Sequence, residues 1–334
     1  MIEQTKKNVK ETSKRILDME TGESTPLNEG DRIVRGKSVE AYREKKKKEE
    51  QAKKEQLEDL LARGTYVQVI HTEERKIEKD LSLPLSNVLL RLFHCVTLES
   101  KNYLIHTSGE NKGKKMNQKE IASFLGKSER QTVRDLNALV ELEALKSEKN
   151  PKGKNERFYS LNSVFFTATS REGVKLGFTK VFHDKLKEIE SKLSSNQYGA
   201  LLKFMRFFHH QTYYLVRNPD YNIIINPNLS ISSNLLLEEN ESVLQHLNQR
   251  KLADIIGIDE KVVIKYVEAY KNAGILMVLE SNYSHRFMIH PDLMFRKSGK
   301  GDKNDQEYAD FVRSQFKQLE PKTLSKSKRK RKRK

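Results

Sequence analysis

Four polar side chains within two helical turns have the chemistry to read the edges of nucleic-acid bases. Arg130, Gln131, Arg134 and Asn137 fall on the outward face of a predicted helix that starts after Ser128. Arginine can make two hydrogen bonds to a guanine edge, and asparagine or glutamine can make two to an adenine edge. This face therefore indicates a helix that lies in a major groove.

The sequence predicts a further helix at residues 118–125, immediately before this one. Asn117 precedes an apolar-periodic run and is followed three residues later by Glu120, which is the pattern of a capping box. Gly126 then ends the predicted helix, and Ser128 starts the next with Gln131 as its expected reciprocal cap. The expected arrangement is two short helices joined by a tight turn.

Apolar residues of the second helix recur at helical spacing and are expected to pack inward. They are Val133, Leu136, Leu139 and Val140.

The chain contains this pattern twice. Residues 248–276 align without a gap with residues 117–145, so that Asn248 corresponds to Asn117. The identities fall on the cap, the turn glycine and the closing leucine, while Arg134 and Lys265 keep a positive charge at the same position. A chance similarity would not concentrate on caps, turn and core, so the sequence predicts a structural duplication.

Each copy is followed by a predicted β-hairpin. The first spans residues 145–161 and has a basic tip, and the second spans residues 275–289 with a tip at 281–285. Helix, turn, helix and hairpin together predict a winged helix-turn-helix. Helix pairs with a capped glycine turn also occur in folds that bind no nucleic acid, and that alternative stays open here.

The charge of the chain favours a polyanionic partner. Lys and Arg total 63 against 46 Asp and Glu, which gives a formal net charge of +17. Nine of the cations and no acid lie in residues 322–334, so +8 remains for the rest. No apolar stretch approaches the roughly 20 residues of a membrane span, and the N-terminus has no apolar signal core.

The predicted fold class is α+β, mainly α, with two tandem winged helix-turn-helix domains. The first predicted domain, 65–168, contains a strand at 66–70, an amphipathic helix at 85–98 and a short strand at 103–106; the second, 169–300, contains a strand at 174–182 and helices at 183–193 and 198–208. Residues 1–64 are expected to form a charged, partly helical and partly disordered arm, with a solvated helix at 38–63. Residues 301–334 are expected to form a disordered basic tail.

Catalytic and cofactor chemistry is not indicated. The glycines of residues 108–116 miss the spacing of a phosphate-binding loop, and His209 and His210 are adjacent instead of separated by one residue as in rolling-circle nickases. The single Cys95 is expected to be a core thiol, because no second cysteine or ligand spacing accompanies His94. We therefore expect no enzyme activity, no metal and no cofactor.

The duplicated segments resemble the winged-helix replication initiators of Gram-positive plasmids and phages. The resemblance covers residues 85–166 and 198–295 and includes the endings YSLNSVFF and FMIHPDLMF, although Ser163 stands where the first ending would carry proline. The layout is also similar to theta-type plasmid initiators with tandem winged helices. The resemblance implies binding to repeated origin sequences and recruitment of host helicase-loading proteins.

The expected function is sequence-specific binding of double-stranded DNA as a replication initiator in the cytoplasm, associated with the nucleoid. The first alternative is a winged-helix transcriptional regulator, because regulators of the multiple-antibiotic-resistance type share the same helix-turn-helix pattern. The second alternative is a structural DNA-coating or segregation protein. A homodimer is also left open. The residues predicted to contact DNA are Ser128, Arg130, Gln131, Thr132, Arg134, Asn137, Lys152, Lys154, Arg157, Lys261, Lys265, Lys271, Tyr283, His285, Arg286, Lys328, Arg329, Lys330 and Arg331.

Overall fold

The protein is represented by a computed structural model that describes most of the segment from residue 64 to residue 319. The described residues are 15–17, 24–26, 42–48, 50–51, 64–72, 77–150, 156–168, 177–223, 233–234, 242–281, 284–296 and 303–319. They are α+β and mainly helical, with small antiparallel sheets. The chain divides into two compact units, Met1–Gln51 and Ala52–Lys334.

The first unit holds a short strand pair and part of the predicted charged helix. Strand β1 (Arg15–Leu17) pairs antiparallel with β2 (Ser24–Pro26), a pairing that the sequence did not predict. Residues 42–48 are helical and exposed. The predicted helix at 38–63 is therefore confirmed for residues 42–48 and 50–51, and its remaining residues lie outside the described part of the chain.

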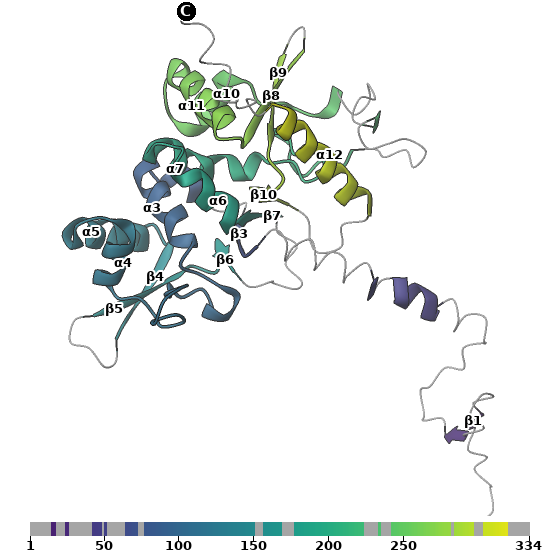
Figure 1. The fold of residues 1–334 in the computed structure, drawn as a ribbon, viewed down its shortest axis with the longest axis horizontal. Helices are drawn as coiled ribbons and strands as arrows, with labels where there is room; N and C mark the ends of the chain where they lie inside the picture. The colour runs from purple at the N-terminus through teal and green to yellow at the C-terminus, as the bar shows by residue number, and fades with distance from the viewer. Residues whose placement is uncertain are drawn as a thin grey trace, which may run out of the picture. The chain divides into compact units, whose positions relative to one another are not determined.

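A four-stranded antiparallel sheet lies at the centre of the second unit, in the order β10-β7-β3-β6. Strands β3 (Tyr66–His71) and β6 (Phe166–Thr167) flank the first copy of the duplicated pattern, and β7 (Gly177–Phe182) and β10 (Met294–Phe295) flank the second. Figure 1 shows these strands between the two copies.

The two central strands pair with approximate two-fold symmetry. Tyr66 lies opposite Phe182, and Ile70 lies opposite Phe178. If Tyr66 of β3 is equivalent to Phe178 of β7, then Ile70 is equivalent to Phe182. Exchanging each residue for its equivalent then turns the pair Tyr66–Phe182 into the pair Phe178–Ile70. The central strands of the two copies are therefore exchanged by a pseudo-dyad.

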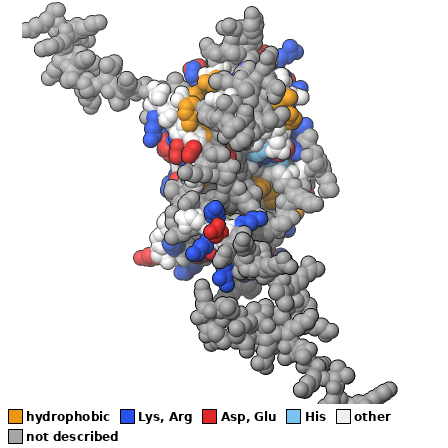
Figure 2. Space-filling view, turned by 90° about the vertical axis from the view of Figure 1, so that its right-hand side faces the viewer, with side chains coloured by type: hydrophobic (Ala, Val, Ile, Leu, Met, Phe, Trp, Pro, Cys, Tyr) orange, Lys and Arg blue, Asp and Glu red, His pale blue; other side chains and the backbone are white. Residues whose placement is uncertain are grey.

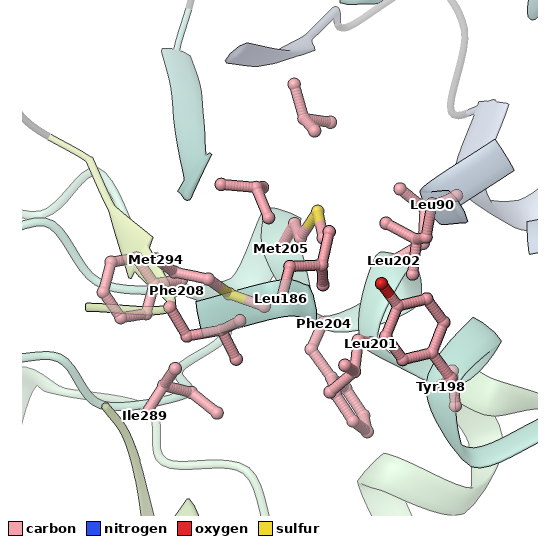
Figure 3. Packing of buried hydrophobic residues seen from close by; sticks show 14 of the residues in the cluster. Leu90, Leu186, Tyr198, Leu201, Leu202, Phe204, Met205, Phe208, Ile289 and Met294 are labelled. Carbon is pink, nitrogen blue, oxygen red and sulfur yellow. The ribbon is translucent and has the colours of Figure 1, made fainter. Parts of the chain in front are cut away.

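The helices after these strands pack against each other across the same pseudo-dyad. Helix α3 (Leu83–Phe93) starts after Ser82, and α7 (Ser195–Phe204) starts after Ser194, which is the equivalent position in the second copy. In Figure 3, Leu90 of α3 lies next to Leu202 of α7, and both side chains are buried.

Gly199 allows the backbones of α3 and α7 to approach closely. A Cβ atom at residue 199 would collide with the carbonyl oxygen of Leu83 and lie 2.9 Å from the amide nitrogen of Asn87. Asn87 is the residue of α3 that corresponds to Gly199. The smallest side chain is thus required where the two helices cross.

The predicted helix pairs and hairpins are present in both copies. The first copy has α4 (Gln118–Leu125), α5 (Glu129–Glu141), β4 (Leu145–Lys149) and β5 (Arg157–Leu161). The second has α10 (Gln249–Ile256), α11 (Glu260–Asn272), β8 (Leu276–Ser281) and β9 (Ser284–Ile289). Helices α10 and α11 start and end at the positions equivalent to the bounds of α4 and α5, as the gapless alignment predicts.

In each copy, a further segment of extended backbone pairs with the second strand of the hairpin. The amide of Leu104 donates to the carbonyl of Tyr159 over 2.9 Å, and the amide of Leu215 donates to that of Phe287 over 2.8 Å. The short strand predicted at residues 103–106 is present only as isolated bridges at Tyr103 and Ile105. The duplication therefore includes the extended segment that pairs with each hairpin.

The other helices connect these elements. They are α2 (Ile77–Asp80), the 3₁₀ turn η1 (Leu98–Ser100), α6 (His183–Glu190) and the 3₁₀ turn η2 (Met205–Phe207).

Helix α12 (Lys303–Leu319) corrects the prediction of a disordered tail for residues 303–319, while residues 301–302 and 320–334 of that predicted tail lie outside the described residues. Tyr308, Val312 and Phe316 recur every four residues and are buried, which is the stripe of a helix packed on a core. The Tyr308 hydroxyl donates to the carbonyl of Thr212, and Arg313 forms an ion pair of 2.8 Å with Asp292. These contacts attach α12 to the second copy (Figure 1).

The two copies share one core. Strand β3 pairs with β7, and α3 packs on α7, so residues of both copies fill a single hydrophobic cluster. The predicted boundary between domains 65–168 and 169–300 consequently runs through a packed interface within the unit Ala52–Lys334.

Buried histidines make the stability of this core depend on pH. Burial, with a smaller contribution from His94, lowers the pKa of His183 to about 3, and burial lowers the pKa of His94 to about 4. Their rings lie 5.6 Å apart. Since an unfolded histidine titrates near 6.5, the unfolded chain binds these protons first as the pH falls, so stability is lost below that pH.

Each of these histidines is expected to cost about 1.4 kcal/mol of unfolding free energy on going from pH 7.5 to 5.5. Urea unfolding of the wild type at the two pH values measures the total loss. The His183→Gln variant should show a smaller loss between the two pH values. An identical pH dependence in both proteins would contradict this assignment.

Candidate nucleic-acid interface

The exposed face of α5 carries three of the side chains predicted to contact bases. Arg130, Arg134 and Asn137 are all exposed. Within the described part of the chain, neither arginine has an ion-pair partner. Both guanidinium groups are thus available to an external acceptor.

The start of α5 is held by a cap and by a charged cluster behind it. The Ser128 hydroxyl accepts a hydrogen bond from the amide of Gln131 over 3.3 Å, which confirms the predicted cap. The reciprocal bond predicted for the Gln131 side chain is wrong: its amide donates to Asp135 over 2.7 Å. Lys127 forms a 2.7 Å ion pair with the other oxygen of Asp135.

This cluster explains why Gln131 differs from its neighbours on α5. Asp135 is buried and negatively charged, so it needs partners, and Lys127 and Gln131 provide them. Gln131 is half-buried, and one of its donors is used inside the protein. Gln131 therefore helps to hold the start of α5 in place, and its amide group is only partly available for contact with DNA.

Thr132 does not lie on the exposed face that was predicted for it. Its side chain is 0% exposed, and the buried stripe of α5 consists of Thr132, Asp135, Leu136 and Leu139. Val133, expected inside, is half-buried. The stripe contains two polar residues, which an apolar pattern cannot identify, so the inward direction of the helix was misjudged by one position.

Helix α11 presents a different surface at the equivalent positions. Lys261 and Lys265 are exposed, but Val262 and Ile264 between them are also 36% and 46% exposed. The N-cap is Asp259, whose carboxylate accepts from the amide of Lys261 over 2.8 Å. This face is more apolar than that of α5, and its helix starts at an acidic cap instead of a neutral one.

Lys271, at the end of α11, is paired within the helix. Its ammonium group lies 2.9 Å from the carboxylate of Glu268. Both side chains are exposed, so this ion pair is weak and exchangeable.

The first hairpin adds exposed cations beside α5. Lys146 and Lys149 on β4 and Arg157 on β5 are exposed, and Lys149 lies directly opposite Arg157. Lys152 and Lys154, predicted at the tip, lie outside the described residues. In Figure 2, lysine and arginine side chains gather in the lower part of the described surface.

A cluster at the base of this hairpin was missed by the sequence reasoning. Lys115 lies 2.6 Å from Glu148 and 3.3 Å above the ring of Tyr103, whose hydroxyl donates to Glu148 over 2.8 Å. The hydrogen bond from Lys115, followed by that from Tyr103, lowers the pKa of Glu148. The signal was hidden because residues 108–116 read as a flexible basic loop.

The second hairpin and the C-terminal cations are described only in part. Arg286 is half-buried, while Tyr283 and the side chain of His285 lie outside the described residues. The predicted phosphate contacts Lys328, Arg329, Lys330 and Arg331 also lie outside them.

Two of the residues considered for metal or nucleophilic chemistry, Cys95 and His209, are buried. Cys95 is 2% exposed, and burial raises the pKa of its thiol to about 12. Burial lowers the pKa of His209 to about 3, and its ring contacts the carbonyl of Tyr221 over 2.8 Å. Among the described residues, no group of three His, Cys, Asp or Glu side chains could hold a metal ion.

No helix in the described part of the chain is long and apolar enough to cross a membrane. No protein-family model, curated protein or solved structure matches the chain.

Proposed function

We propose that the protein binds double-stranded DNA in a sequence-specific manner through two winged helix-turn-helix units, with α5 as the principal recognition helix. The exposed arginines of α5 carry this proposal. Arg130 and Arg134 lie one turn apart on an N-capped helix, and a hairpin with exposed Lys146, Lys149 and Arg157 follows it. Arginines at such positions fit the guanine edges of a major groove, and the hairpin cations fit the adjacent phosphates.

The shared core supports a binding site with two parts. Because α3 and α7 are packed together, α5 and α11 belong to one compact unit. Their relative placement is then fixed before DNA arrives, so a single chain would lose little ordering entropy when it contacts two segments of one duplex. This is the property expected of a protein that recognises a composite site.

The biological role that we propose is initiation of replication on a plasmid or phage. It rests on the resemblance of the duplicated segments to winged-helix initiators. In such a role the protein binds repeats at an origin and recruits host helicase-loading proteins.

Selection from a random duplex library with the full-length protein tests DNA recognition. Enrichment of a defined sequence is expected, followed by tighter binding to that sequence than to a scrambled duplex in mobility-shift titrations. Equal affinity for all duplexes would refute sequence-specific recognition. A replicon that carries this gene with its flanking repeats, and no other initiator, then tests the replication role.

Deleting residues 322–334 should flatten the salt dependence of DNA binding. This segment holds nine cations and no acid, and each phosphate that a protein neutralises adds about 0.9 to the slope of log affinity against log salt. Filter-binding titrations from about 50 to about 300 mM salt would measure the slope for the full-length and for the truncated protein, because DNA affinity changes strongly over this range. The preference for the selected sequence should be unchanged, and an unchanged slope would show that the segment does not contact phosphate.

A further inference from the structure

A cationic cavity opens between α2, the end of α7 and α10. Its volume is about 460 Å³, within the range of small-molecule sites. Phe207, Ile255 and Ile256 form its apolar wall. Its charged lining consists of Lys79, Lys203, Arg206, Arg217 and Lys251, with Glu78 and Asp254 as the acids.

The position in the first copy that is equivalent to this cavity is filled by an ion pair. On the side of the first copy, the pseudo-dyad makes Glu190 equivalent to Glu78 and Arg91 equivalent to Lys203. Arg91 and Glu190 form an ion pair of 2.7 Å, and Arg91 also donates to the carbonyl of Leu125 at the end of α4 over 2.6 Å. Arg91 thus connects α3, α6 and α4, which are the elements equivalent to α7, α2 and α10 around the cavity.

In the second copy these connections are redirected away from the cavity. Lys203 is 6% exposed and donates to the carbonyl of Leu81 over 2.7 Å. Glu78 pairs instead with Arg206, over 2.8 Å. The end of α10 therefore receives no side chain like Arg91 among the described residues, and the space beside it stays open.

Two further positions change from an attractive pair to two like charges. In the first copy, His106 and Glu120 lie 3.3 Å apart. The backbone pairing places Arg217 at the position of His106, and the alignment of α10 with α4 places Lys251 at that of Glu120. Arg217 and Lys251 both line the cavity, and their positive charges repel each other unless an anion lies between them.

The lining of the cavity consequently carries more positive than negative side chains. Five cations face two acids, and one of the acids is already paired with Arg206. Lys79 and Arg217 are exposed, and neither has an ion-pair partner in the described part of the chain. The ammonium group of Lys251 donates to the carbonyl of His246 over 3.3 Å.

We infer that this cavity binds a small phosphorylated ligand with an apolar or aromatic portion, of the size of a nucleoside diphosphate. Lys79, Arg217 and Lys251 would contact the phosphates, because guanidinium and ammonium groups match phosphate oxygens. Phe207 and Ile255 would contact the uncharged portion. This inference concerns a site other than the DNA-contacting faces and does not depend on the proposed function.

Calorimetric titration of the full-length protein, without DNA, tests the site. The probes are ADP, inorganic pyrophosphate and adenosine. ADP is expected to bind, pyrophosphate to bind more weakly, and adenosine to show no measurable binding. The Arg217→Ala variant should weaken ADP binding about tenfold or more, since it removes a charge-assisted contact to the ligand from an exposed side chain.

Arg250→Ala is the matched control. Arg250 is an exposed cation on α10, next to Lys251, and it does not line the cavity. Its loss should leave ADP affinity unchanged, while Lys79→Ala should reduce it. No heat of binding with ADP or pyrophosphate would overturn the inference, and so would an affinity that is equal in the wild type and Arg217→Ala, because that result would place the anion elsewhere on this cationic chain.

Discussion

Replacing Arg134 by alanine is expected to lower affinity for the selected DNA site about 5- to 150-fold, or ~1–3 kcal/mol, and to affect random DNA much less. Arg134 is exposed on α5 and lacks an ion-pair partner among the described residues, so the substitution removes no internal contact. Side-by-side titrations of the wild type and the variant on the selected and scrambled duplexes measure both effects. An equal loss on the two duplexes would show that Arg134 contacts only phosphate.

Lys265→Ala is the matched substitution in the second copy, since residue 265 corresponds to residue 134. A smaller loss is expected there. The cap of α11 is Asp259, followed by Glu260, and these carboxylates repel a phosphate at a helix start where Ser128 of α5 is neutral. A larger loss for Lys265→Ala would mean that α11 is the principal recognition helix.

Replacing Gly199 by leucine is expected to destabilise the folded chain by more than ~4 kcal/mol. Even a Cβ atom at this position collides with the backbone of α3, and helix backbones cannot give way as a flexible side chain can. The unfolding free energy from urea denaturation, followed by circular dichroism, measures the effect. The variant should also lose cooperativity, because both copies depend on the α3–α7 contact.

Asn196→Leu provides the control for this prediction. Asn196 is exposed on α7, one turn before Gly199, and gains the same side chain without a backbone collision. Its unfolding free energy should stay within about 0.5 kcal/mol of the wild type. A Gly199→Leu protein as stable as this control would refute the close packing of α3 and α7.

The sequence by itself determined the local elements of the duplicated pattern. Asn117 and Glu120 form the predicted capping box, and Gly126 and Gly257 end α4 and α10 with φ of 64° and 78°, where glycine is favoured. These features depend on residues within one turn of each other. Their spacing alone therefore predicted four helices and two hairpins close to their observed bounds.

The sequence was less informative about which side of a helix is buried. Leu136 and Leu139 were correctly placed inside, but Thr132 and Asp135 complete the buried stripe of α5. Burial of Asp135 depends on Lys127 and Gln131 satisfying its charge. Such pairing is a property of three-dimensional neighbours that an apolar pattern cannot express.

Only the tertiary structure decided how the copies combine and where a cavity forms. The pairing of β3 with β7, the crossing at Gly199 and the docking of α12 join residues far apart in the sequence, and no local rule selects among such partners. Residues 77–82 and 189–194, IEKDLS and IESKLS, mark the equivalence of α3 with α7 but are too short to be read as a repeat. Because this equivalence matches Arg91 with Lys203, the difference between a closed contact and an open cationic cavity became visible only when both copies were folded against one core.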